Sequence, residues 1–153
     1  MSTVERIPDV EVARRLRSRR EVDGLDYYRV LRRLAVQMTQ VDLARSLGLT
    51  QPSISSALKS AARVAEPRDG FSGASPYEIA QRYSAGEMTR EQTIDELSRW
   101  QYVPAPRTDG YDWLTDDPDG TWDEVRRALS DGLLDAEMYT AVQDRIDGLR
   151  SAI

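Results

Sequence analysis

Residues 39–62, with the sequence TQVDLARSLGLTQPSISSALKSAA, decide the fold because their spacing is that of a helix-turn-helix. Counted from Gln40, a small residue, Ala44, stands at the fifth position and a glycine, Gly48, at the ninth. Two short helices can cross closely only where the contact residue is small, and the tight turn between them favours a residue that adopts positive φ. Ala44 and Gly48 meet these two demands.

Apolar residues recur along this segment at helical spacing, which predicts helices near 40–47 and 51–64. The apolar positions are Leu43, Leu47 and Leu49 in the first helix and turn, and Ile54, Ala57, Leu58 and Ala61 in the second. The opposite face of the second helix is polar and is therefore free for DNA.

In a helix-turn-helix the second helix enters the major groove with its N-terminal residues nearest the base edges. Here we expect Thr50 to cap the second helix. Gln51 can pair with adenine N6 and N7, because its amide offers one donor and one acceptor. Serines position the helix more than they specify a base, Lys59 can read guanine or bind phosphate, and Gln40 can donate to a phosphate at a helix N-terminus. The candidate DNA-contacting residues are Gln40, Thr50, Gln51, Pro52, Ser53, Ser55, Ser56, Lys59 and Arg63.

The segment resembles the helix-turn-helix of the Cro and Xre class of bacterial and phage repressors, with Gln40, Ala44, Gly48 and Ile54 at matching places. Residues 50–61 are also similar to the recognition helix of MarR-like winged proteins. The chain from Arg63 to Tyr77 offers one weak strand candidate and no second strand of a wing, which favours the all-helical class. The DNA-binding region of alternative sigma factors is a third relative, but nothing resembles their polymerase-binding or promoter-melting regions.

The composition restricts the chemistry available to these 153 residues. The sequence contains no cysteine and no histidine, which excludes disulfides, the usual zinc sites and histidine acid–base catalysis. We expect no cofactor, no metal and no enzymatic activity. The N-terminal residues lack an apolar signal core and no run approaches a membrane span, so we expect a cytoplasmic, nucleoid-associated protein without a membrane partner. Lys59 is the one lysine, a bias typical of GC-rich bacterial or phage genes.

Charge divides the chain near Arg68. Up to that residue there are 13 Lys and Arg against 8 Asp and Glu, and beyond it 8 against 18. A basic half can neutralise phosphates, whereas an acidic half is repelled by them and suits a protein partner or simply keeps the chain soluble.

The predicted organisation is all-α, with a four-helix DNA-binding domain over residues 1–65, a linker over 66–75 and an acidic helical domain over 76–153. The first domain begins with helices at Pro8–Arg20 and Leu25–Met38, the second of which exposes Arg29, Arg32 and Arg33 and buries Val30. Capping boxes begin at Ser75, Thr89 and Thr121 and start three helices of the second domain. A fourth helix follows Asp135.

Five aspartates between the last two capping boxes suggest a metal site: Asp109, Asp112, Asp116, Asp117 and Asp119. An EF-hand register on Gly120 puts Thr115 and Arg126 where an aspartate and a bidentate glutamate are needed, so calcium is excluded. Two or more of these carboxylates could bind magnesium in a nuclease-like site, but turn chemistry explains the pairs Asp109-Gly110 and Asp119-Gly120 without a metal.

These observations predict a sequence-specific transcriptional regulator, a repressor that binds double-stranded DNA as a homodimer. Dimerisation is expected because such proteins occupy two half-sites about 34 Å apart, and residues 76–153 would dimerise or bind a protein partner. The alternative is an antitoxin-type interaction protein, whose acidic domain neutralises a protein partner and whose DNA binding is autoregulatory. A metal-dependent nuclease that uses Asp116 and Asp117 is a distant third.

Overall fold

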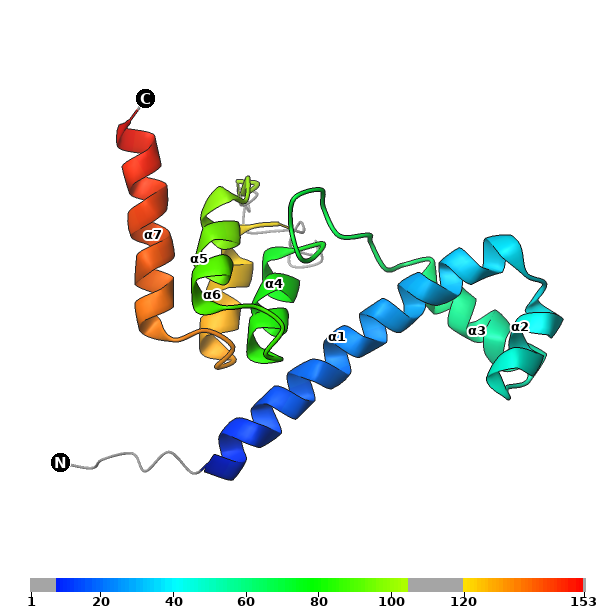
Figure 1. Cartoon of the computed structure of the whole chain (residues 1–153). Coiled ribbons are helices and arrows are strands. Elements are labelled where there is room, and N and C mark those ends of the chain that lie inside the picture. Colours follow the sequence, from blue (N-terminus) through cyan, green and yellow to red (C-terminus); the bar gives the residue numbers. More distant parts are fainter. Residues whose placement is uncertain (1–7, 105–119, 153) are drawn as a thin grey trace, which may run out of the picture. The chain divides into compact units, whose positions relative to one another are not determined.

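The computed structural model describes residues 8–104 and 120–152, and every regular element in these ranges is an α-helix. Figure 1 shows the seven helices in chain order. The all-α prediction is therefore confirmed. Within the described ranges, no helix combines the length and the apolar character that crossing a membrane requires.

The chain divides into two compact units. The small unit is Arg20–Glu66, and the large unit combines the described parts of Met1–Arg19 and Pro67–Ile153. The division after residue 66 falls at the start of the predicted linker. Residues 8–19, which the sequence assigns to the DNA-binding domain, group with the large unit instead.

A single helix, α1, runs over Pro8–Gln37, where the sequence predicted two helices at 8–20 and 25–38. That prediction was wrong because residues 21–24 contain no proline and Gly24 keeps the helical conformation. One interior glycine costs about 1 kcal/mol relative to alanine, which does not end a helix whose neighbours favour it. The helices that begin before residue 66 are thus α1, α2 and α3, and not four.

The small unit is built on α2 (Gln40–Leu47) and α3 (Gln51–Ala61), which pack against each other and against the C-terminal part of α1. Its buried core consists of Leu31, Leu43, Ala44 and Ile54. Ala44 is 4% exposed, which agrees with its predicted role as the small residue at the crossing.

Three residues of the predicted apolar stripes lie outside this core. Leu47 is 43% exposed, Leu49 44% and Val30 42%. A unit of this size has too little interior to cover every apolar position. Leu31 of α1 lies in the core of the small unit, whereas Val30, on a different side of the same helix, is exposed.

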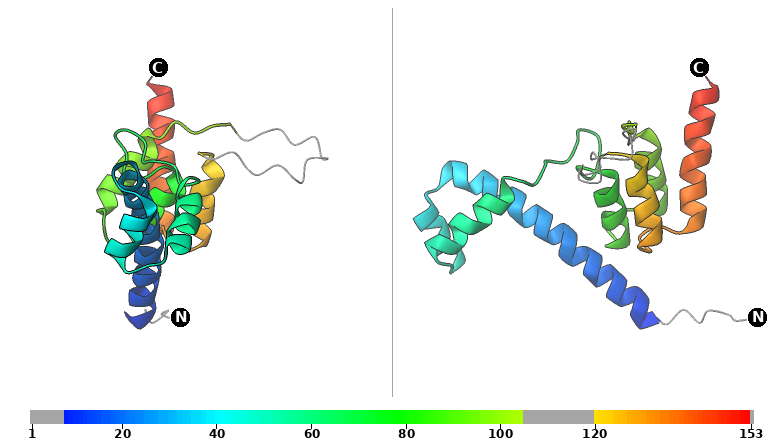
Figure 2. Two further views of the ribbon diagram at one scale, coloured as in Figure 1. Left: turned by 90° about the vertical axis from the view of Figure 1, so that its right-hand side faces the viewer. Right: turned by 180° about the vertical axis from the view of Figure 1, so that it is seen from behind.

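The large unit contains α4 (Pro76–Ser84), α5 (Arg90–Arg99), α6 (Trp122–Ser130) and α7 (Ala136–Ser151). Helices α5 and α6 each pack against α4 and α7, an arrangement visible in Figure 2. The larger of the fully buried apolar side chains at its centre are Ile79, Leu97, Val125, Met138 and Val142. The sequence predicted all four helices.

Only one of the three predicted capping boxes is complete. At Thr89 the side chain accepts from the Gln92 backbone N–H, and the Gln92 side chain accepts from that of Thr89. Ser75 caps α4, but the Glu78 carboxylate accepts from Arg82 at 2.9 Å and does not return to Ser75. Thr121 makes no side-chain capping bond.

Residues of the predicted linker pack onto the large unit. The Ser72 hydroxyl donates to the buried Glu96 carboxylate at 2.7 Å, and the ring of Phe71 lies edge-on to Trp100 at 4.9 Å. The guanidinium of Arg68 stacks over the same tryptophan at 4.2 Å. From Arg68 onward this segment therefore belongs to the packed part of the chain.

Candidate nucleic-acid interface

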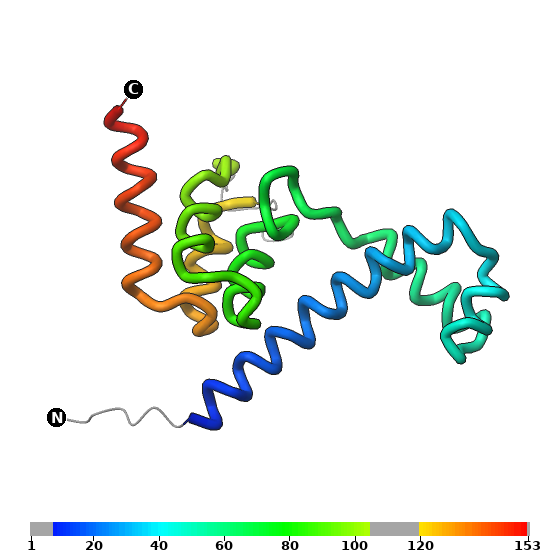
Figure 3. Tube along the Cα trace, in the orientation of Figure 1, coloured from blue at the N-terminus to red at the C-terminus, as the bar shows by residue number. Residues whose placement is uncertain are grey.

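The turn between α2 and α3 is a Schellman motif. Gly48 has φ 69° and ψ 28°, its N–H donates to the Arg45 carbonyl at 3.3 Å, and the Leu49 N–H donates to the Ala44 carbonyl at 2.8 Å. These are the two bonds that define the motif. Figure 3 shows how tightly the trace reverses here. The glycine predicted for a positive-φ turn occupies such a turn.

The start of α3 is held by its predicted cap. Thr50 is extended, and its hydroxyl accepts from the Ser53 N–H at 3.2 Å. That hydroxyl also donates its one proton to the Ser53 hydroxyl at 2.8 Å. Thr50 and Ser53 are therefore engaged with each other, while Gln51 and Pro52 form the exposed first turn.

One face of α3 and its C-terminal extension carries four of the nine predicted contacts. Residues spaced by four, three and four positions share a helix face, and the members of this row are Pro52, Ser56, Lys59 and Arg63, all exposed. The buried Ile54 and Ala61 lie on the other side. Ser55 was predicted to lie on the exposed face but is half-buried at its margin.

The two glutamines at the helix N-termini are joined. Gln51 donates from Nε2 to Gln40 Oε1 at 2.8 Å, and both side chains are otherwise exposed. An amide has two N–H donors and a carbonyl acceptor. Gln51 therefore keeps one donor and its acceptor, and Gln40 keeps both donors, so the pair is fixed without losing its capacity for recognition.

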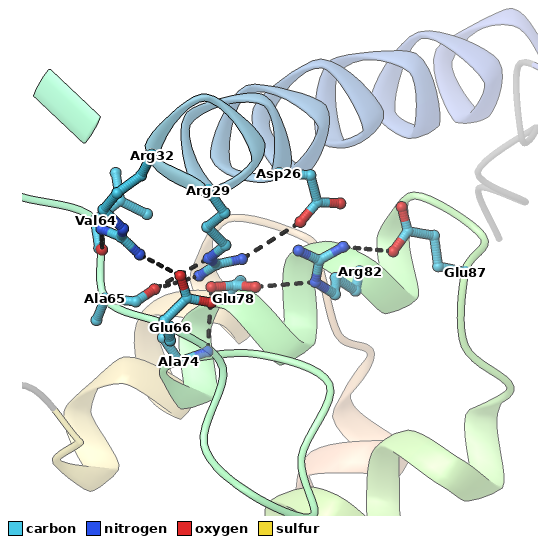
Figure 4. Close-up of polar contacts among 10 residues, drawn as sticks. All are labelled: Asp26, Arg29, Arg32, Val64, Ala65, Glu66, Ala74, Glu78, Arg82 and Glu87. Atoms are coloured by element: carbon cyan, nitrogen blue, oxygen red, sulfur yellow. Dashed lines mark hydrogen bonds and ion pairs between the residues drawn. The ribbon is translucent and has the colours of Figure 1, made fainter. Parts of the chain in front are cut away.

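Arg32 was predicted to be exposed, but it is half-buried and binds the C-terminal end of α3. Its guanidinium donates to the Ala61 carbonyl at 2.7 Å. It also donates to the Val64 carbonyl at 2.5 Å and forms an ion pair with Glu66, as Figure 4 shows. The last carbonyls of a helix lack intrahelical partners, and no glycine is present to close this end. The hydrogen bond from Arg32 lowers the pKa of the Glu66 carboxyl below its ordinary value.

Arg29 was also predicted to be exposed, but only 3% of it is accessible. It donates to the Ala65 carbonyl from Nε at 3.0 Å and from Nη2 at 2.8 Å, and it lies 3.4 Å from Asp26. Arg29 and Arg32 are thus spaced one helical turn apart on α1 and hold the segment that follows α3. No local sequence signal marks this role, because the carbonyls that the two arginines bind lie about thirty residues away in sequence.

Five other cations of the small unit are exposed: Arg20, Arg33, Arg45, Lys59 and Arg63. Arg45 lies on α2 and was not among the predicted contacts. Long, exposed cations of this kind can contact phosphate without reading sequence. The small unit therefore has a polar helix face, a fixed glutamine pair and several surface cations together.

The acidic residues divide between the described and the undescribed parts of the chain. Asp109, Asp112, Asp116, Asp117 and Asp119, the considered metal ligands, all lie outside the described residues. Among the residues that the structure describes, no group of three or more carboxylates could hold a metal ion. On the large unit, Asp135 caps α7 and pairs with Arg90 at 2.6 Å, and the pairing lowers the pKa of Asp135.

No protein-family model, curated protein or solved structure matches the chain. The α2–α3 surface and the exposed cations of the small unit are therefore the features that bear on function.

Proposed function

We propose that the protein is a sequence-specific DNA-binding transcriptional regulator, a repressor that places α3 in the major groove. The observation that carries this proposal is the Gln40–Gln51 hydrogen bond at 2.8 Å. It orients an exposed amide at the N-terminal end of a capped helix, which is the end that approaches base edges in a helix-turn-helix.

The hydrogen-bonding groups that remain available suit two kinds of contact, one to a base and the others to phosphates. Gln51 can accept from adenine N6 and donate to N7 while it still donates to Gln40, and such a bidentate contact discriminates between bases by about 1–3 kcal/mol. Gln40 can use its free donors on a backbone phosphate near the start of α2. Lys59 and Arg63, farther along the same face, supply charge for phosphates.

The proposal extends to a dimer, because an operator read by helix-turn-helix proteins has two half-sites about 34 Å apart. The Cro and Xre resemblance of residues 39–62 points to the same class. Exposed cations in the small unit support the phosphate contacts that every such complex needs.

Selection of bound sequences from a random DNA pool tests the proposal. We expect enrichment of one motif with two related halves. Gln51→Ala should then weaken binding to that motif by roughly 1–3 kcal/mol and relax preference at one base pair, as measured by fluorescence anisotropy on all four base variants. The matched control is Gln37→Ala, the same change at an exposed glutamine at the end of α1. A pool that enriches nothing, or a Gln51→Ala protein with unchanged base preference, contradicts the proposal.

Lys59→Gln separates phosphate binding from base reading. If Lys59 neutralises one phosphate, its loss should weaken binding to all sequences alike and reduce the slope of log affinity against log salt by about 0.9. If Lys59 reads guanine instead, the loss will be confined to sequences that carry one base pair.

A further inference from the structure

Helix α1 carries a row of exposed residues with the spacing of a coiled-coil seam. The spacing alternates between three and four, which keeps the residues on one side of a helix. The α1 seam consists of Ala13, Leu16, Arg20, Asp23, Tyr27 and Val30, all of them exposed. Leu16 is 53% exposed, Tyr27 43% and Val30 42%, so apolar surface lies at both ends of the row, with two charged residues between them.

The α1 seam of one chain is complementary to the α1 seam of a second chain that runs in the opposite direction. If a second α1 is laid antiparallel so that Arg20 faces Asp23 of the other copy, two-fold symmetry repeats this ion pair. The same register places Leu16 against Tyr27 and Ala13 against Val30, again twice each. A pair that is symmetric in this way is what an isologous homodimer requires.

The charges also determine the direction of the pairing. In a parallel pair with the same seam, Arg20 would face Arg20 and Asp23 would face Asp23, and like charges at an interface are costly. Polar residues within a seam specify register and orientation at some cost in stability. Neither Arg20 nor Asp23 forms an ion pair with a described residue of its own chain, so both charges are available to a partner.

We propose that the partner on this seam is a second copy of the chain, which pairs with the first through antiparallel α1 helices. This part of the inference rests on the proposed function: the pairing also sets the distance between the two DNA-reading units. Leu31, the α1 residue in the core of the small unit, would lie 19 residues along the axis from its copy, about 29 Å at 1.5 Å per residue. This separation is close to the roughly 34 Å between half-sites one turn apart.

Charge exchange tests the pairing on the full chain, without DNA, by sedimentation equilibrium over a wide range of concentrations. We expect the wild type to dimerise and Arg20→Asp and Asp23→Arg each to raise the dimer dissociation constant by about tenfold or more. The two variants mixed together should form a heterodimer, since each then supplies the charge that the other lacks. The double variant Arg20→Asp, Asp23→Arg should dimerise alone.

The matched control is Glu21→Arg, an acid-to-arginine change at an exposed site on the opposite side of α1, which should leave dimerisation unchanged. Circular dichroism of each variant checks that α1 remains helical, and restoration in the mixture cannot come from unfolded chains. A monomeric wild type, single variants that dimerise like the wild type, or no restoration in the mixture overturns the inference. A Gln51→Ala protein that dimerises and keeps an unchanged base preference would instead contradict the proposed function alone and leave the pairing standing.

Discussion

The same substitution at two glycines of the small unit should change stability in opposite directions. Gly24 lies inside α1 with an ordinary helical conformation, and Gly48 has φ 69°. An added Cβ meets nothing within 4 Å at either position. Packing is therefore equal in the two cases, and only the backbone conformation differs.

The expected free energies of unfolding follow from that difference. Gly24→Ala should stabilise the unit by about 1 kcal/mol, the helix-propensity difference between glycine and alanine. Gly48→Ala forces alanine into the left-handed region, which destabilises the folded state by roughly 1–2 kcal/mol. Alanine also reduces the conformational entropy of the unfolded chain, which offsets about 0.4–1 kcal/mol of this destabilisation. The net effect is a destabilisation of about 1 kcal/mol, so the two variants should differ by about 2 kcal/mol.

Urea unfolding followed by circular dichroism at the helix band measures this difference. With a slope of about 1–3 kcal/mol per molar urea, the midpoints of the two variants should differ from each other by about 1 M. The midpoint of the wild type should lie between them. Gly48→Asn is the internal control, because asparagine tolerates positive φ better than alanine. Midpoints that move in the same direction would refute the conformational argument for Gly48.

Two further changes probe the core and the end of α3. Ile54→Ala removes a side chain with no exposed surface and should cost about 2–5 kcal/mol in thermal or urea unfolding, whereas Ser56→Ala on the exposed face should stay within about 0.5 kcal/mol. Because Arg32 lowers the folded-state pKa of Glu66 from its ordinary 4.5, the Glu66 carboxylate stabilises the fold above that pH, and this contribution is lost as pH falls through the lowered pKa. The urea midpoint measured as a function of pH should show this loss of stability in the wild type and not in Arg32→Met. The same pH profile in both proteins would contradict the stabilisation of Glu66 by Arg32.

Local signals allowed much of the fold to be predicted. Thr50 and Thr89 do cap helices, and Gly48 does adopt positive φ. Each of these features depends on a few neighbouring residues whose hydrogen bonds close within one turn of the chain. Helices α2 to α7 follow from such signals without knowledge of the tertiary structure.

The roles of the arginines on α1 could not be predicted in this way. Arg29 and Arg32 bind carbonyls that lie about thirty residues away in sequence, so no local pattern records the contact. Composition counts every cation as available to phosphate, but these two are used to hold the end of α3. Within the proposed function, the cations that remain for DNA are those still exposed, chiefly Arg33, Arg45, Lys59 and Arg63.

The continuity of α1 has the largest consequence for function. Two helices broken at residues 21–24 would place Leu16 and Tyr27 on unrelated axes, and no common seam would exist. In the single helix Pro8–Gln37 these residues fall on one face, with Arg20 and Asp23 between them. Gly24 lies just beyond this centre, where the sequence pattern suggested a break. A variant that does break the helix there, Gly24→Pro, should therefore abolish antiparallel pairing, whereas Gly24→Ala should preserve it.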